Sequence, residues 1–441
     1  MRDVSRRGGD DASTEADTLR RSDDRKSIRV SEVRRSATRA LLAAAPALLV
    51  VSLILRVVWT LFTPNGSNWV DLHVYVDGSA GLFGGSLYDF TYSDETPDFP
   101  LPFTYPPFAA VVFYPLHFLP FALVGALWMI ATIAALYAVV RLALRMVGGD
   151  LADSPSWRRA ALLWTTVGLW TESMRTTLDY GQVNVFLVLL AMLAVRSARW
   201  WLSGALVGIA AGVKLTPAIT GLYFLAQRRW RAAAFSAVAF AATVAVSFLL
   251  AGSAATTYFT TLLGDADRIG PVGSVWNQSL RGALSRVAGH DVGQGPVWIV
   301  AAVIVLTAAF LAWRALGRND RLGTLVIVSF VGLMISPISW SHHWVWVVPM
   351  LIWLLHGPLS HAPGARVLAG YWLVVTVVGV PWILSFAQPS IWDISRPLPL
   401  ALAGAVYAVG TLALFVWIAV MGRRVSARAD RSHLPAGRPS R

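Results

Sequence analysis

The sequence predicts an all-α protein that crosses a membrane many times. Three observations predict this fold class: hydrophobic residues make up 56% of the 441 residues, charged residues make up only 14%, and long apolar runs recur along the chain. Soluble domains carry about 25% charged residues, and a membrane helix needs about 20 mainly apolar residues. The chain has no cysteine, which excludes disulfides, thiolate catalysis and cysteine-based metal sites.

The chain divides into a tail, a membrane domain and a second tail. Residues 1–39 are polar and of mixed charge, so they are expected to form a disordered cytoplasmic tail. No small-residue cleavage site follows the first apolar run, which is therefore predicted to be an uncleaved membrane helix. Residues 40–421 are expected to form the membrane domain, and 422–441 a second cytoplasmic tail.

Twelve apolar segments separated by polar residues are predicted to span the membrane. They are 41–62, 120–144, 159–173, 182–197, 202–213, 216–227, 232–251, 296–316, 322–336, 344–356, 367–387 and 399–421. The alternative for 202–227 is a single helix kinked at Pro217. Residues 105–119 are apolar but short and interrupted by prolines, so an interfacial or re-entrant piece is predicted there.

The basic residues predict the orientation in the plasma membrane. With both termini in the cytoplasm, 30 of the 37 Lys and Arg residues fall on the cytoplasmic side, as membrane proteins prefer. The net charge of +13 is therefore interpreted as this bias and not as a nucleic-acid-binding surface. Two long loops, 63–104 and 252–295, then face the outside. Loops of this length are usually functional or disordered, and the aromatic and charged residues of the first favour function.

The candidate site consists of the polar residues at the outer ends of the predicted spans. They are Asp71, His73, Tyr75, Glu172, Arg175, Asp179, Gln182, Asn184, Lys214, Trp276, Asn277, Gln278, Ser279, Arg281, His342 and His343. Taken singly, Asp71 also fits a solvated surface carboxylate, Arg175 an ion pair and the two histidines interfacial residues. Lys214 is harder to explain structurally, because a cation between apolar helices is costly. Arg56, inside the first span, receives no role.

One outward carboxylate, several cations and aromatic loops beside a bilayer favour a reaction on a lipid-phosphate-linked substrate. The cations would hold the phosphate and stabilise its growing charge, and the carboxylate would act as general base on the attacking hydroxyl. The apolar grooves between the spans would hold the lipid tail. The site has no Asp-x-Asp pair, so neither a divalent metal nor an organic cofactor is expected. If a metal did bind, His73 and the His342–His343 pair would be its ligands.

Five segments carry a resemblance to a known family. DLHVY (71–75), GQVN (181–184), GVKLTP (212–217), WNQSL (276–280) and SPISWSHHW (336–344) are similar to segments of glycosyltransferase family 87. This family has the GT-C membrane fold and includes actinobacterial α-1,2-mannosyltransferases that use polyprenyl-phosphate-mannose. The resemblance covers roughly residues 40–421. It rests on the order of the segments and their shared membrane side, since no single segment is specific.

The resemblance implies roles for individual residues. Asp71 matches the family's catalytic base. The family's histidine near the outer end of a late span matches either His342 or His343. Lys214 and Arg175 suit the donor phosphate. The expected substrate-binding residues are His73, Tyr75, Glu172, Gln182, Asn184, Trp276, Asn277 and Gln278.

The implied reaction transfers mannose with inversion, at the extracytoplasmic side, to a glycolipid acceptor of the phosphatidylinositol mannoside or lipomannan type, forming an α-1,2 linkage. One alternative is an arabinofuranosyltransferase that uses polyprenyl-phosphate-arabinose. Another is a flippase or transporter for a lipid-linked sugar. A transporter would place polar groups at mid-membrane and repeat one half of the chain in the other, and the sequence contains no such repeat.

Overall fold

The computed structural model describes residues 36–62, 66–96, 99–317 and 319–432, with the side chains of 425–432 left out. Nearly all of the predicted N-terminal tail and the end of the C-terminal tail lie outside these residues. The described part of the chain is mostly helical, and its strands form one short antiparallel pair, β1 (Thr91–Tyr92) and β2 (Leu101–Pro102). The fold class predicted from the apolar composition, mostly helical and rich in membrane-length helices, is confirmed.

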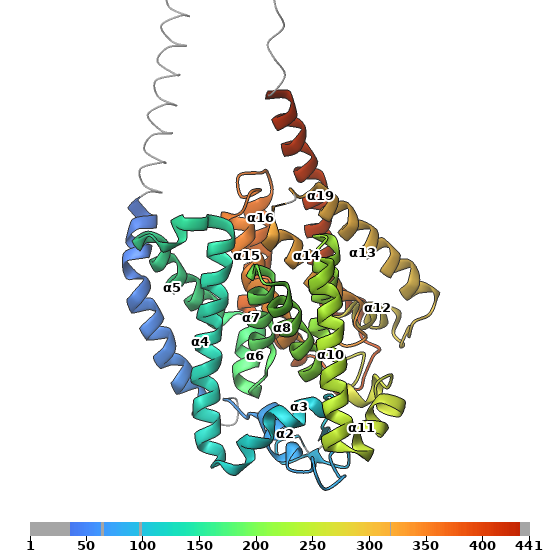
Figure 1. The fold of residues 1–441 in the computed structure, drawn as a ribbon. Coiled ribbons are helices and arrows are strands. Elements are labelled where there is room, and N and C mark those ends of the chain that lie inside the picture. Colours follow the sequence, from blue (N-terminus) through green and yellow to red (C-terminus); the bar gives the residue numbers. More distant parts are fainter. Residues whose placement is uncertain (1–35, 63–65, 97–98, 318, 433–441) are drawn as a thin grey trace, which may run out of the picture.

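Five helices are long and apolar enough to cross a membrane (Figure 1). They are the first helix, Ser36–Thr60, α4 (Phe121–Gly148), α10 (Trp230–Ala251), α13 (Pro296–Ala315) and α19 (Val406–Ser432). A sixth crossing results if α6 (Glu172–Tyr180) and α7 (Asn184–Arg196), which meet at 118°, count as one broken span. Twelve crossings are therefore not confirmed, although a helix occupies each predicted range.

The remaining predicted ranges hold short helices, several of them in two pieces. They are α5 (Pro155–Trp170), α8 (Trp200–Val213), η3 (Thr216–Ile219), α9 (Thr220–Ala226), α14 (Arg321–Ile335), η6 (Ser341–Trp346), α15 (Val347–His356), α16 (Ala365–Val378), α17 (Val380–Ser385) and α18 (Leu398–Ala403), with η2 (Gly149–Asp153) after α4. Region 202–227 is not one kinked helix, because the extended backbone of Lys214 separates α8 from η3.

The two predicted outer loops contain secondary structure of their own. The first holds α2 (Val70–Ser79), β1 and β2, and it leads into α3 (Pro107–Phe113) and η1 (Tyr114–Phe118). The second holds α11 (Ser253–Thr257), η4 (Tyr258–Leu262), which is one turn of π-helix, η5 (Asp267–Ile269) and α12 (Leu280–Ala288). Figure 1 places α2, α3 and α11 together at the end opposite to the one where the first helix begins and α19 ends.

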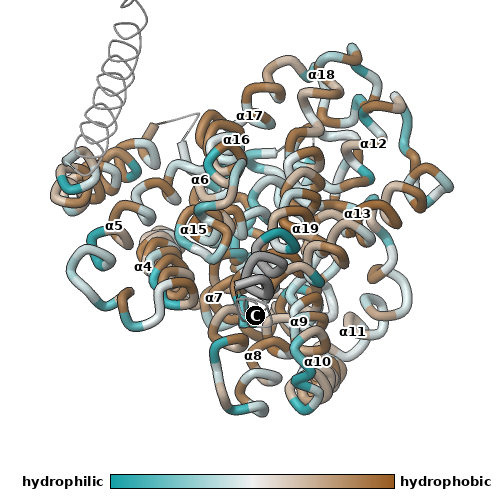
Figure 2. The backbone as a smooth tube through the Cα atoms, turned by 90° about the horizontal axis from the view of Figure 1, so that it is seen from above, coloured by the Kyte–Doolittle hydropathy of each residue, from teal (hydrophilic) through white to brown (hydrophobic). Residues whose placement is uncertain are grey.

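Two apolar clusters hold the helices together. The larger surrounds α15, whose residues 347–354 are all buried, and it includes the buried rings of Trp344, Trp353 and Trp372. The smaller joins α2 and α3 to parts of α7 and α8. On the outside, α4 and α13 carry exposed apolar side chains and lie at the periphery of Figure 2, where both are largely brown. Such faces suit contact with lipid tails.

Candidate active site

A cavity of about 670 Å³ lies where the two outer segments meet α6, α8 and η6. Its lining includes six of the predicted site residues, drawn from separate parts of the chain. They are Asp71, Gln182, Lys214, Trp276, His342 and His343. Cavities of this size suit small-molecule ligands. The sequence pattern had grouped these residues only by membrane side, whereas the fold brings them together around one cavity.

Asp71 occupies the first turn of α2, where the exposed backbone N–H groups of a helix favour a negative side chain. It is half-buried, and burial raises the pKa of its carboxyl group to about 6. A hydrogen bond from the Gln182 side chain and the positive charge of Lys214 act against burial and lower this pKa. The carboxylate is thus a base that is ionised at neutral pH and still basic enough to accept a proton.

Gln182 is oriented toward Asp71 by the groups behind it. Its Oε1 accepts a hydrogen bond from the Tyr75 hydroxyl at 3.0 Å and one from Asn184 Nδ2 at 3.2 Å. With the oxygen used in this way, the amide N–H groups remain for Asp71. The Tyr75 hydroxyl also lies 2.8 Å from that of Tyr105, which lines the cavity. Tyr75 and Asn184 therefore act on the carboxylate through Gln182.

Lys214 reaches the cavity from the break between α8 and η3. Its Nζ donates to Asn184 Oδ1 at 2.9 Å and lies 3.1 Å from His343 Nε2. Gln182 Oε1 lies at 3.5 Å, and the ammonium group sits 5.2 Å from the centroid of the Tyr105 ring. All of these partners are uncharged or aromatic, so the positive charge is held in place without being neutralised by them. Such a charge can bind an anion.

The two histidines are carried by η6. Burial and the charge of Lys214 keep the pKa of both rings well below its usual range, so both are neutral. His343 Nε2 accepts from Lys214, which leaves the ring proton on Nδ1. Neither His343 Nδ1 nor His342 Nε2 has a hydrogen-bond partner among the described residues. The carbonyl oxygen of His342 accepts from Asn184 Nδ2 at 3.0 Å, which ties η6 to α7.

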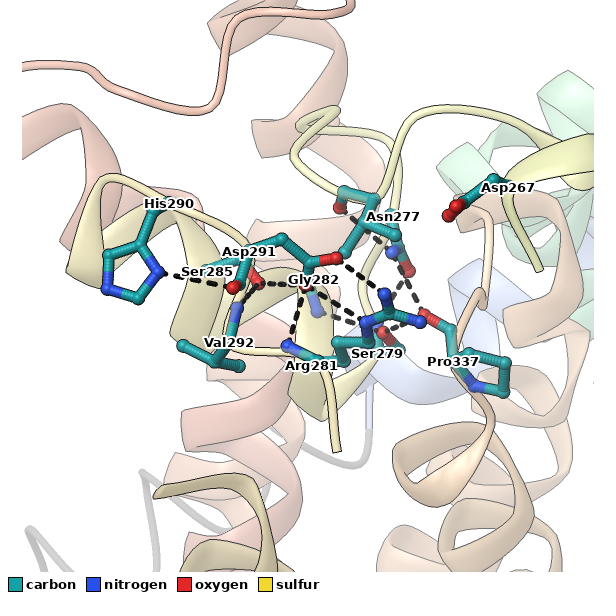
Figure 3. A network of polar contacts seen from close by, with 12 residues as sticks. Asp267, Asn277, Ser279, Arg281, Gly282, Ser285, His290, Asp291, Val292 and Pro337 are labelled. Atoms are coloured by element: carbon teal, nitrogen blue, oxygen red, sulfur yellow. Dashed lines mark hydrogen bonds and ion pairs between the residues drawn. The ribbon is translucent and has the colours of Figure 1, made fainter. Parts of the chain in front are cut away.

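The WNQS segment contributes one ring to the cavity lining and two buried side-chain amides that bond backbone groups. Trp276 lines the cavity. The Asn277 side chain is fully buried and bonds four backbone groups: Nδ2 donates to the carbonyls of Val272 and Pro337, and Oδ1 accepts from the amides of Ser279 and Ser339. Figure 3 shows Asn277, Ser279 and Pro337 within this network. Gln278 Nε2 likewise donates to two backbone carbonyls.

Ten of the sixteen predicted site residues are not among the residues that line the cavity, and His73, Glu172 and Arg175 are three of them. His73 stacks between Tyr92 and Phe121, and its Nδ1 lies 2.9 Å from Asp77 Oδ2. Glu172 is fully buried at the start of α6. Arg175 is half-buried, with its guanidinium 5.6 Å from the Trp382 ring centroid. Their substrate-binding and phosphate-binding roles stay predictions.

Several cavity residues were missed by sequence reasoning. They are Asn68, Tyr105, Tyr180, Arg268 and Trp340. Tyr105 opens an apolar segment that was assigned to the membrane interface. Arg268 was counted only as one of the few outward basic residues, and its Nη2 donates to the carbonyl oxygen of Phe103 at 2.8 Å, linking the two outer segments. Asn68 precedes Asp71 by three residues, a spacing that places both near one helix start.

The arrangement suits transfer of a group away from an anionic leaving group. It combines a raised-pKa carboxylate, a lysine ammonium held by neutral partners, and the rings of Tyr105, Trp276 and Trp340 around a common space. The carboxylate can accept a proton while the ammonium stabilises negative charge. Aromatic faces are suited to packing against the apolar faces of sugar rings.

Comparison with known proteins adds independent findings. A model of glycosyltransferase family 87 matches residues 103–337. The chain is 60% identical over 377 residues to the polyprenol-phosphate-mannose-dependent alpha-(1-2)-phosphatidylinositol pentamannoside mannosyltransferase of Mycolicibacterium smegmatis, which covers 85% of this chain and 91% of that protein. The protein of the same description from Mycobacterium tuberculosis is 58% identical over 389 residues, covering 88% and 90%.

A third relative is more distant and has a different acceptor in its description. It is the polyprenol-phosphate-mannose-dependent alpha-(1-2)-phosphatidylinositol mannoside mannosyltransferase of Mycobacterium tuberculosis, 34% identical over 310 residues, covering 67% of this chain and 72% of that protein. No solved structure matches the chain.

Proposed function

The chain belongs to glycosyltransferase family 87, and from that premise we propose that it is a membrane mannosyltransferase. It transfers mannose from polyprenol-phosphate-mannose to a phosphatidylinositol mannoside and forms an α-(1→2) linkage with inversion. The two relatives near 60% identity support phosphatidylinositol pentamannoside as the acceptor. Their descriptions also favour mannose over arabinose as the transferred sugar.

The proposed reaction uses the cavity residues in two roles. Asp71 removes the proton from the acceptor hydroxyl as its oxygen attacks the anomeric carbon of the donor mannose. The bond from that carbon to the phosphate oxygen breaks, and polyprenyl phosphate leaves with the bonding electrons. Lys214 stabilises the negative charge that grows on this phosphate. The Nδ1–H of His343 is a further donor beside the same lysine.

One observation carries the proposal: the cavity holds Asp71 and Lys214 close enough for the lysine charge to lower the pKa of the carboxyl group, yet no direct hydrogen bond between them is present in the described residues. A base and a phosphate-binding cation must be neighbours, because the attacked carbon lies between the hydroxyl and the phosphate. A directly bonded ion pair would occupy both groups and leave neither for substrate.

The cavity is proposed to face the extracytoplasmic side. It lies at the end of the molecule that carries α2 and α11, whereas the first helix begins and α19 ends at the opposite end (Figure 1). The bias of basic residues supports placing those termini in the cytoplasm. This orientation lets donor and acceptor approach laterally from the outer leaflet.

The test is a transfer assay with the purified protein in nanodiscs. Polyprenol-phosphate-mannose and phosphatidylinositol pentamannoside are supplied to the wild type and to Asp71→Asn. Removing a general base lowers rates by about 10²- to 10⁴-fold, and we expect kcat to fall within this range while donor binding is kept. Digestion of the product with a linkage-specific mannosidase identifies the new bond.

Asp77→Asn is the matched control, because Asp77 is exposed on the same helix and outside the cavity lining. It should keep the wild-type kcat. An Asp71→Asn variant with near-normal turnover refutes the assignment of the base. If the wild type is active with polyprenol-phosphate-arabinose and inactive with polyprenol-phosphate-mannose, the donor is the arabinose lipid and the proposed donor is wrong. Binding of the donor without any transfer would favour the transporter.

A further inference from the structure

Arg56 is a charged residue buried in the first membrane helix. Its exposed fraction is 1%, and it lies within the apolar helix Ser36–Thr60. A buried charge in a membrane helix is costly and usually marks a function. The proposed reaction gives this arginine no task, since it is not among the residues that line the cavity.

The partner of Arg56 is Asp179, at the end of α6. Arg56 Nη2 donates to Asp179 Oδ1 and, at 3.3 Å, to the hydroxyl of Ser67. The Ser67 hydroxyl donates in turn to Asp179 Oδ1 at 3.2 Å. These three residues come from the first helix, from the chain just before α2 and from α6. They therefore join three segments at one point.

The backbone of Asp179 holds the same stretch of chain. Its carbonyl oxygen accepts from the amide of Asn68 at 3.1 Å and from the amide of Trp69 at 2.8 Å. Trp69 has φ +50° and ψ +31°, a left-handed conformation that costs free energy for a residue with a bulky side chain. Such a conformation persists only when surrounding contacts impose it. The Asp179 carbonyl is one of those contacts.

The turn at Trp69 determines the position of the first turn of α2, which carries Asp71. Trp69 is the N-cap of α2, and its carbonyl oxygen accepts the helical bond from the amide of His73 at 2.9 Å. Asp71 follows Trp69 by two residues. A rotation at Trp69 would therefore redirect the first turn of α2 and move the carboxylate relative to Gln182 and Lys214.

The residues after Asp179 approach the same helix. A Cβ added to Gly181, whose φ is +73°, would meet the Leu72 Cβ at 2.6 Å, so the end of α6 lies directly against α2. Gln182 then supplies the hydrogen bond to Asp71. One short stretch, 179–182, thus contacts α2 before, at and after the carboxylate.

We propose that the buried Arg56–Asp179 pair is a positioning device for Asp71: it holds residues 67–69, with Trp69 in its left-handed conformation, and so sets the position of the carboxylate in the cavity. This proposal rests on the proposed role of Asp71 as base. Arg56 and Asp179 are positioning residues, since neither lines the cavity. Stability alone is a poor reason for the pair, because a buried ion pair is often no more stabilising than apolar residues of similar volume.

The test replaces both charges at once with Arg56→Met/Asp179→Leu. A single substitution would leave an unpaired buried charge and strongly destabilise the protein, whereas the double variant should melt within a few degrees of the wild type. A misplacement of about 1 Å can cost about 10²-fold in rate. We expect kcat to fall about 10- to 100-fold with the donor KM within about twofold of wild type.

A second readout does not depend on catalysis. Hydrogen–deuterium exchange is followed in a peptide that covers residues 66–72, where the amides of Asn68 and Trp69 should exchange faster in the double variant. Arg141→Met/Asp153→Leu is the control: it removes a more exposed Arg–Asp pair, at 2.7 Å, far along the chain from α2, and with it the contact of Asp153 to Arg145. It should change neither kcat nor exchange in this peptide.

Wild-type kcat in the double variant overturns the proposal, and so does unchanged exchange of the Asn68 and Trp69 amides. A loss of folded protein equal to the loss of activity would reduce the pair to a structural role and also overturn it. If the wild type itself transfers no mannose, the proposed function fails. The exchange measurement then still decides whether the pair holds the turn.

Discussion

The carboxyl group of Asp71 has two opposing influences on its pKa, and both can be tested. Burial raises the pKa to about 6, and Gln182 and Lys214 lower it by favouring the charged form. The base must be ionised to accept a proton. Activity should therefore be low below this pKa and rise as the pH increases through it.

We predict that kcat increases with pH around 6 and levels off above about pH 7. In Gln182→Leu the carboxylate loses a hydrogen bond, its pKa rises, and the acid limb moves to higher pH. The measurement is a pH profile of kcat with saturating donor. A limb near the usual aspartate pKa, or one that Gln182→Leu shifts downward, contradicts this account.

Lys214 gives a second prediction at the scale of single residues. Lys214→Met removes the charge that stabilises the leaving phosphate, and losing one such group costs about 10²- to 10³-fold in kcat. Lys214→Arg should remain poor, because the partners at 2.9 and 3.1 Å are arranged around a compact ammonium. Both variants are compared with the wild type at saturating acceptor. Turnover by Lys214→Met close to wild type would exclude the phosphate role.

Residue types selected some of the residues that line the cavity, but they did not separate lining residues from structural ones. Asp71, Lys214 and the two histidines were selected as outward polar groups, and all line the cavity. Asn277 and Gln278 were selected on the same ground, yet their amides bond backbone groups. An amide offers the same donors to a carbonyl oxygen and to a sugar, so sequence does not separate the two uses.

At the scale of elements, apolar runs located the helices and misjudged their lengths. Each predicted range overlaps a helix, because long apolar segments in a membrane must satisfy their backbone hydrogen bonds internally. The break at Lys214 was expected, between the predicted segments 202–213 and 216–227, but the contacts of Asn184 and His343 that hold the ammonium there were not. Hydropathy has no term for such tertiary contacts.

The buried hydrogen bonds of Asn277 lead to a prediction about how α12 and α14 are held together. Of the four hydrogen bonds of this side chain, those with Val272 and Ser279 lie within the segment before α12, and those with Pro337 and Ser339 connect it to the segment after α14. Asn277→Ala leaves buried backbone groups unpaired, at a cost of roughly 2–4 kcal/mol. We expect a clearly lower melting temperature in detergent, and a higher acceptor KM because Trp276 is the adjacent residue.

Asn277→Asp is the informative companion variant. Its carboxylate keeps the two acceptor contacts from Ser279 and Ser339 but loses both donors, so it should melt below the wild type as well. A melting temperature unchanged by Asn277→Ala would mean that water replaces the amide at this site, and its hydrogen bonds would then carry little of the loop's stability.

At the scale of the whole molecule, the distribution of basic residues and the position of the cavity both favour the proposed orientation in the membrane. The cavity lies at the end of the helices where few basic residues occur, and Arg141, Arg145, Arg158 and Arg159 lie around the opposite end of α4. Electrostatic bias of this kind sets the orientation of membrane proteins during insertion. The proposed use of an outer-leaflet donor depends on that orientation.

The absence of native cysteines allows a direct test of the orientation. Gly264→Cys lies in an exposed turn near α11, and a Cβ added there meets nothing within 4 Å. Asp150→Cys is exposed in η2, at the other end of α4. A membrane-impermeant maleimide applied to intact cells should label Gly264→Cys at once and Asp150→Cys only after the membrane is permeabilised. The opposite pattern would place Asp71 on the cytoplasmic side, and the donor would then have to be drawn from the inner leaflet.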